Sequence, residues 1–109
     1  MTYKQIATMI EAVGIPCAYY QFEEGTGIQP PFITFYYSGD NDMKADNVNY
    51  ALVRPLVIEL YTDEKDFTLE ETVESVLTAN GLAFSRTETY IDSEKMFMVT
   101  YYTEVNINA

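Results

Sequence analysis

The sequence predicts an α+β fold, a two-layer sandwich in which two helices pack on one face of a mainly antiparallel or mixed β-sheet. Apolar residues recur at helical spacing in two segments, at the start of the chain and after residue 66. Five other segments are rich in the aromatic and β-branched residues that favour strands. The 109 residues contain no repeat and no linker, so they fit a single domain over 1–109.

The first helix is predicted directly after Thr2, a suitable N-cap. Gly14 stands where a left-handed C-cap belongs, and Pro16 prevents the helix from resuming. The apolar stripe consists of Ile6, Met9, Ile10 and Val13. A helix this short needs a surface to cover, and a sheet is the obvious candidate.

Residues 17–22 and 32–37 are predicted strands, separated by a polar loop that contains Glu23 and Glu24. The pair Pro30-Pro31 favours extended backbone before the second of these strands. Residues 38–47 are rich in Asp and Asn, which predicts an exposed loop.

Residues 48–62 form the longest predicted strand, with apolar side chains on both faces. Pro55 cannot donate to a ladder, so we expect a bulge or a one-sided edge there.

The second helix is predicted to begin at Thr68, which forms a capping box with Glu71, while Phe67 is placed for a hydrophobic staple. Asn80-Gly81 closes it. The buried stripe is Leu69, Val73, Val76 and Leu77. A hairpin completes the chain, with strands over 82–90 and 97–107 and a turn at 92–95.

The charge balance excludes several classes of protein. Seventeen acidic residues stand against six basic ones and there is no histidine, which gives a formal charge of -11 and a pI near 4.1. Proteins that bind duplex DNA rely on cations, and so do proteins that dock on anionic membranes. The missing histidine removes the commonest general base and metal ligand. We therefore expect no specific binding of DNA and no membrane binding.

The single cysteine, Cys17, has apolar neighbours and no histidine to activate it, so we expect a structural role. No apolar run approaches a membrane span, and the start of the chain lacks the apolar core of a signal peptide. These features predict a soluble protein made in a reducing cytosol.

Asp40, Asp42 and Asp46 are the weak candidates for a metal site, because their spacing resembles the opening of a calcium loop. The rest of that pattern fails, since Lys44 intrudes and Ala51 stands where a bidentate Glu belongs. A solvated loop is the default interpretation.

Two glutamate groups could hold a divalent ion or act as a catalytic acid and base. They are Glu23-Glu24 and Glu70-Glu71-Glu74. The first lies in a loop and the second suits the dipole at the start of a helix, so both are interpreted as solvated surface. With no phosphate-binding or nucleophile motif, we expect no enzyme, no catalytic residue and no cofactor.

Ten tyrosines, several of them in adjacent pairs, suggest an association surface. Adjacent residues on a strand point to opposite faces, so one ring of each pair should lie on the outer side of the sheet, beside Met98 and either Tyr50 or Tyr61. The alternative is an aromatic ladder that stabilises the sheet by itself. The candidate interface residues are Tyr20, Tyr36, Tyr37, Met98 and Tyr102.

Four stretches together resemble a known family. They are residues 15–22 (IPCAYYQF), 30–33 (PPFI), 58–66 (IELYTDEKD) and 87–96 (TETYIDSEKM). The chain resembles the small tail-terminator and tail-completion (neck) proteins of long-tailed phages and prophages of Gram-positive bacteria. The resemblance covers nearly the whole chain, and its motifs are structural.

The resemblance implies a homo-oligomeric, hexameric ring at the head-proximal end of the tail tube, assembled in the bacterial host cytoplasm and resident in the virion tail or neck. Its implied partners are other copies of itself, the tail tube protein and the head-completion or connector protein. DNA would pass without being bound, repelled by a lumen-facing acidic loop of Asp40, Asp42 and Asp46. Alternatives are a head-closure or minor tail protein, an acidic mimic of nucleic acid, and a carboxylate-only metal enzyme.

Overall fold

The computed structural model describes residues 1–45 and 48–108, and at residues 49 and 50 it describes the backbone alone. The helices are α1 (Tyr3–Glu11) and α2 (Phe67–Ala79). The strands are β1 (Cys17–Tyr19), β2 (Phe32–Tyr37), β3 (Met43–Ala45), β4 (Val48–Thr62), β5 (Ser85–Ile91) and β6 (Met96–Ile107).

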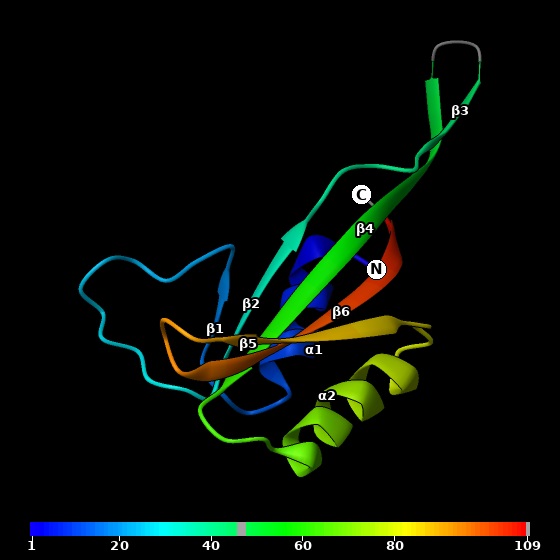
Figure 1. Ribbon diagram of the computed structural model, residues 1–109. Helices are drawn as coiled ribbons and strands as arrows, with labels where there is room; N and C mark the ends of the chain where they lie inside the picture. Colours follow the sequence, from blue (N-terminus) through cyan, green and yellow to red (C-terminus); the bar gives the residue numbers. More distant parts are fainter. Residues whose placement is uncertain (46–47, 109) are drawn as a thin grey trace.

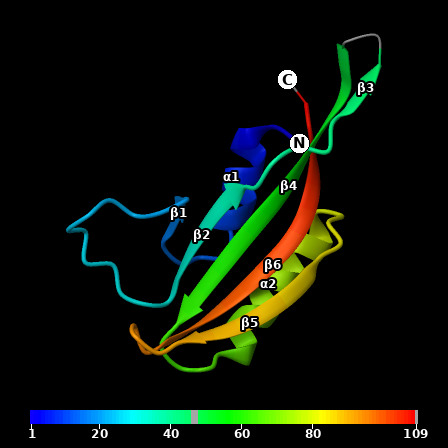
Figure 2. The same ribbon diagram turned by 45° about the horizontal axis from the view of Figure 1, so that its top comes forward.

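The strands form one sheet in the order β1-β2-β4-β6-β5, and β3 pairs with the start of β4. The β1–β2 pair is parallel and the other pairs are antiparallel. Both helices lie on the same face of the sheet (Figures 1 and 2). The predicted α+β class, with a mixed sheet and helices on one face, is confirmed.

The core lies between the helices and the sheet, because the strands turn alternate side chains toward the helices. Ile33, Leu60 and Val99 share a register across β2, β4 and β6, and each is at most 1% exposed. The helices contribute Ile6, Met9, Ile10, Val73 and Leu77.

Thr2 caps α1 as predicted. Its hydroxyl accepts a hydrogen bond from the Gln5 N–H, and the Gln5 side chain accepts one from the Thr2 N–H. The helix ends at Glu11, earlier than the sequence suggests. Ala12 is the C-cap, in right-handed conformation, and the left-handed Gly14 follows two residues later.

The predicted N-cap of α2 is wrong. Asp66, not Thr68, caps the helix, because its carboxylate accepts from the Leu69 N–H at 2.9 Å. Phe67 thereby becomes the first helical residue and is 68% exposed, so it forms no staple. The predicted end is confirmed, with Asn80 as C-cap and Gly81 at φ 74°.

Three strand boundaries differ from the prediction. The first strand ends at Tyr19, since Tyr20 adopts φ 68° and leaves the extended region. The strand expected from residue 82 begins at Ser85. Within the predicted loop 38–47, β3 pairs with the start of β4 as a short hairpin, which the polar composition of the segment does not indicate.

Pro55 causes no bulge, and this part of the prediction is wrong. The β4–β6 register runs unbroken past the Pro55–Glu104 pair. The β2 ladder ends one residue away, at Tyr37–Leu56, and the Ser38 N–H donates to the Pro55 carbonyl. Pro55 therefore has a partner strand on one side only, which was the second alternative.

Candidate functional site

The face of the sheet opposite the helices, called the outer face below, carries side chains in three cross-strand rows. The order in each row is β2, β4, β6 and β5. The first row is Phe32, Tyr61, Met98 and Thr89; the middle row is Thr34, Glu59, Thr100 and Thr87; the third is Tyr36, Val57, Tyr102 and Ser85. A polar row thus lies between two rows that begin with aromatic rings.

The middle row is sheltered although both helices lie on the other face. Thr34 and Thr100 are only 5% and 4% exposed. The Thr34 hydroxyl donates to Glu59 Oε1 at 3.2 Å. Because the larger side chains of the flanking rows shield these groups, Glu59 is a half-buried carboxylate near the middle of the outer face.

Aromatic contacts order the side of this face nearest β1. Phe32 stacks on Tyr61 with ring centroids 4.7 Å apart, and Tyr20 meets Tyr36 edge-on at 5.7 Å. Burial raises the pKa of Tyr61. An open hollow of about 430 Å³ lies beside them, lined mainly by Tyr20, Phe22, Phe32, Tyr61 and Met96.

The predicted interface residues divide between the two faces. Tyr36, Met98 and Tyr102 lie on the outer face, and Tyr20 reaches it through its contact with Tyr36. Tyr37 does not, because it shares the parity of the buried Ile33.

Tyr37 packs on the helix side of the sheet. Its ring lies 5.2 Å from that of Tyr3 and 5.9 Å from that of Tyr19, and burial raises its pKa to about 12. Tyr19 is 54% exposed, so its ring does not enter the core. Tyr61 is the outer-face residue of the two alternatives named from sequence, and the side chain of Tyr50 lies outside the described residues.

Sequence reasoning missed the middle row. Glu59 shares the parity of Val57 and Tyr61, and that alternation was the available signal. The adjacent threonines, Thr34 and Thr100, become visible only when the strand register is known.

The acidic loop does not form a cluster. Asp42 is directed into the body of the protein, where its carboxylate accepts from the Arg54 guanidinium and from the Val53 N–H. The Arg54 hydrogen bond lowers the pKa of Asp42. Asp40 instead pairs with Lys44 at 3.4 Å on the surface. Asp46 lies outside the described residues.

The prediction that Glu70, Glu71 and Glu74 form solvated surface is wrong for Glu70. It is 2% exposed. Arg86 Nη2 donates to its Oε1 at 2.6 Å, and Lys65 Nζ lies 2.6 Å from its Oε2 as an ion pair. Glu74 joins the same network, accepting from Arg86 and from the Tyr101 hydroxyl, each at 2.8 Å.

These contacts fasten α2 to the strands rather than form a reactive centre. Glu70 and Glu74 face cations or a buried hydroxyl, whereas Glu23, Glu24 and Glu71 are exposed, as the sequence predicts. Among residues 1–45 and 48–108, no group of three or more His, Cys, Asp or Glu side chains is placed to hold a metal ion.

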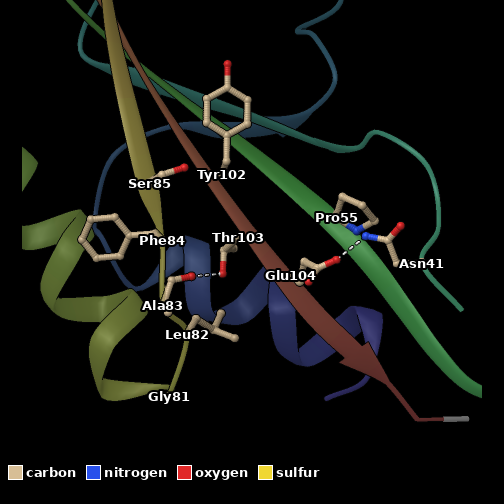
Figure 3. A pocket seen from close by; sticks show the side chains of 10 residues that line it. All are labelled: Asn41, Pro55, Gly81, Leu82, Ala83, Phe84, Ser85, Tyr102, Thr103 and Glu104. Carbon is tan, nitrogen blue, oxygen red and sulfur yellow. Dashed lines mark hydrogen bonds between the residues drawn. The ribbon is translucent and has the colours of Figure 1, made fainter. Parts of the chain in front are cut away.

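A second hollow, of about 510 Å³, opens where the chain enters β5 (Figure 3). Glu104 accepts a hydrogen bond from the Asn41 amide, and the Thr103 hydroxyl donates to the Ala83 carbonyl at 2.6 Å. Of the residues that line this hollow, Glu104 and Tyr102 are ionisable. The ring of Tyr102 points away from Thr103 in Figure 3. This lining offers no acid–base pair.

The start of β4 and the short β3 form a two-stranded arm, residues 43–45 and 48–51, which projects beyond the rest of the sheet (Figures 1 and 2). Met43 and Val48 on this arm are 65% and 55% exposed. The arm was not predicted, because its residues were assigned to a loop and to one long strand.

The fold matches that of a chain in a solved structure described as "Virion of native gene transfer agent (GTA) particle". The TM-score is 0.66 over 98% of this chain and 91% of that chain, at 14% sequence identity. A comparison with protein-family models gives no match, and a comparison with curated proteins gives none either. At this identity the likeness shows a shared fold.

Within the described part of the chain, no helix has the length and apolar character needed to span a membrane.

Proposed function

We propose that this chain is a structural virion protein, a tail-terminator or tail-completion component that forms a ring at the head-proximal end of a phage or prophage tail tube. The observation that carries the proposal is the outer face, an aromatic sheet surface left uncovered by both helices. Large uncovered apolar surfaces are uncommon on proteins that work alone. Tyr and Met, which supply much of this face, are enriched at the centres of interfaces.

The fold likeness supports the same proposal, because the matching chain belongs to a gene transfer agent virion. The resemblance of the sequence to tail-terminator and tail-completion proteins points independently to a particle of this kind. The proposed partners are further copies of the chain, the tail tube protein and the head-completion protein.

A head-closure or minor tail protein is the second candidate, because the matching virion chain supports a structural virion protein without distinguishing these roles. An acidic mimic of nucleic acid would need carboxylates spaced along one face. On the outer face Glu59 and Glu104 lie on the strands and Glu94 lies at the edge of the hollow, while Asp42, Glu70 and Glu74 are paired with cations within the fold.

The repulsion of passing DNA by the acidic loop remains a prediction. The structure reduces the number of loop carboxylates that could contribute to it. Asp42 is paired with Arg54 inside the fold. Among the described residues of the loop, Asp40 therefore remains as the carboxylate that can face a lumen, since its side chain is 48% exposed. We expect Asp40→Asn to slow DNA ejection from intact particles, measured by release of a fluorescent DNA stain. An unchanged rate of DNA ejection would contradict the proposed role of Asp40.

Removal of the gene from its phage or prophage tests the proposed function. We expect tails of uncontrolled length without attached heads in negative-stain images, and restoration of normal length by the gene supplied in trans. Tails of normal length that lack heads would favour head closure. Normal particles without the protein would contradict both candidates.

A further inference from the structure

The end of α2 carries the one Asn-Gly pair of the sequence, Asn80-Gly81. The other five asparagines precede Asp, Val, Tyr, Ile or Ala. The side-chain carbonyl of an asparagine can be attacked by the backbone nitrogen of the next residue, and a side chain on that residue obstructs the approach. Glycine has no side chain and gives the backbone the most freedom. Asn80 is therefore the asparagine of this chain best suited to the reaction, and both residues of the pair are exposed to water.

In the folded chain, hydrogen bonds at the helix end hold both reacting groups. The Asn80 side-chain amide donates from Nδ2 to the Val76 carbonyl at 2.8 Å. The Gly81 N–H donates to the Thr78 carbonyl at 3.0 Å. Gly81 has φ 74°, the left-handed conformation that commonly closes a helix. The attacking nitrogen and the leaving amide nitrogen thus each have a partner on the last turn of α2.

The last turn of α2 can open without unfolding of the whole domain. Chain segments at the ends of elements open at a much smaller free-energy cost than core segments do. The last buried residue of α2 is Leu77, and Asn80 and Gly81 beyond it are exposed. Opening of this turn therefore breaks the two hydrogen bonds that hold the reacting groups but leaves the buried stripe of the helix in place.

We propose that Asn80 is a site of spontaneous deamidation whose rate the end of α2 controls. After the turn opens, the Gly81 backbone nitrogen loses its proton to solvent and bonds to the side-chain carbonyl carbon of Asn80. The bond from that carbon to Nδ2 breaks, ammonia leaves with a proton from water, and a five-membered succinimide ring remains. Water then adds to either carbonyl of the ring and opens it, which gives aspartate or isoaspartate. Water is the co-reactant, and the net change is the exchange of ammonia for water.

The product weakens the end of α2. A carboxylate replaces the donor to Val76 at the C-cap of the helix, where the helix dipole disfavours negative charge. Isoaspartate also inserts a methylene group into the backbone directly before Gly81. Gly81 lines the hollow where the chain enters β5 (Figure 3), so the modification alters the surface of that hollow.

Peptide mass spectrometry of protein incubated at neutral pH tests the site. We expect deamidation to accumulate at Asn80 several-fold faster than at Asn106, an exposed asparagine followed by the β-branched Ile107. In the matched variant Asn80→Gln the side-chain amide is kept, but attack on it needs a larger ring, so this position should stay unmodified. Equal deamidation of Asn80 and Asn106 would overturn the proposal. A product that contains aspartate and no isoaspartate would also overturn it, because the succinimide opens to both.

A second measurement tests control by the helix end. The incubation is repeated in guanidinium chloride that unfolds the chain, and with the folded variant Asp42→Asn, which loses the Arg54 ion pair away from α2. We expect Asn80 to react several-fold faster in the unfolded chain, because the hydrogen bonds of the last turn are lost. Folded Asp42→Asn should react at the native rate, since the opening is local. Equal rates in the folded and unfolded chains, or a faster rate in folded Asp42→Asn, would contradict control by the helix end.

Discussion

Individual carboxylates in this acidic chain have distinct roles. Glu70 and Asp42 are anchors that meet cations inside the fold. Composition alone could not separate them from solvated residues, because Arg54 lies 12 positions from Asp42 and Arg86 lies 16 positions from Glu70 in the sequence. The aromatic residues were easier to place, since the alternation of a strand assigns Tyr101 to the core and Tyr102 to the outer face.

Replacing Glu70 by Gln tests its role as an anchor. Removing the charge leaves Lys65 and Arg86 without their buried partner, and we expect a loss of about 2 kcal/mol in the free energy of unfolding. Both cations are partly exposed and water compensates them in part, so the loss falls below that for a fully buried pair. Urea unfolding measures it. Glu71→Gln, at an exposed neighbouring position, is the control and should change stability little.

Asp42 should make stability depend on pH. Its pKa in the folded protein lies below the ordinary value of 3.8, chiefly because Arg54 donates to it. The stabilisation is therefore complete at neutral pH and is lost as the pH falls through the lowered folded pKa. Asp42→Asn should be less stable than the native chain at neutral pH, and the difference should shrink in acid below 3.8. A constant difference in urea midpoint would contradict this account.

At the level of elements, local signals identified both helices and most strands. These signals depend on neighbouring residues and can therefore be recognised in the sequence. They are the N-cap at Thr2, the glycine after α2 at Gly81, and the alternating side chains of β4 and β6. The arm and the start of β5 depend on partner strands, and the register of Met43 with Ala51 has no local signature. The same limit hid the middle row of the outer face, which four separate strands assemble.

The N-terminus of α2 offers a test at this scale. Asp66→Ala removes the acceptor for the Leu69 N–H and should lower the free energy of unfolding by about 1 kcal/mol. Thr68→Ala changes the residue that the capping-box pattern favours, but it leaves the observed cap intact. Urea unfolding of the two variants should show the larger loss for Asp66→Ala. Equal losses would mean that both residues contribute to the cap.

For the whole molecule, the helices, the sheet and the ion pairs produce a two-sided body. One side is a closed core, and the other is an aromatic face with a polar row across it. The arm extends this face beyond the rest of the sheet (Figure 2). Acidic groups on the remaining surface would repel other copies, so the proposed association depends on the outer face.

Tyr102→Glu tests the outer face without altering the core. Tyr102 is 44% exposed, so we expect the variant to keep its circular dichroism spectrum and to lose association, since the new charge lies near Glu59 and Glu104. Tyr90→Glu is the control, because Tyr90 is 46% exposed but pairs with Phe97 on the helix side. Equal association of both variants, by light scattering, would argue against the outer face.

The central claim is that this chain assembles into a ring through its outer face. Native mass spectrometry of the purified protein, alone and bound to isolated tail tubes, tests it most directly. The account predicts a discrete assembly of several copies in at least one of these settings, and single chains for Tyr102→Glu in both. A native chain that stays single in both settings, or an unchanged assembly of Tyr102→Glu, would contradict the claim.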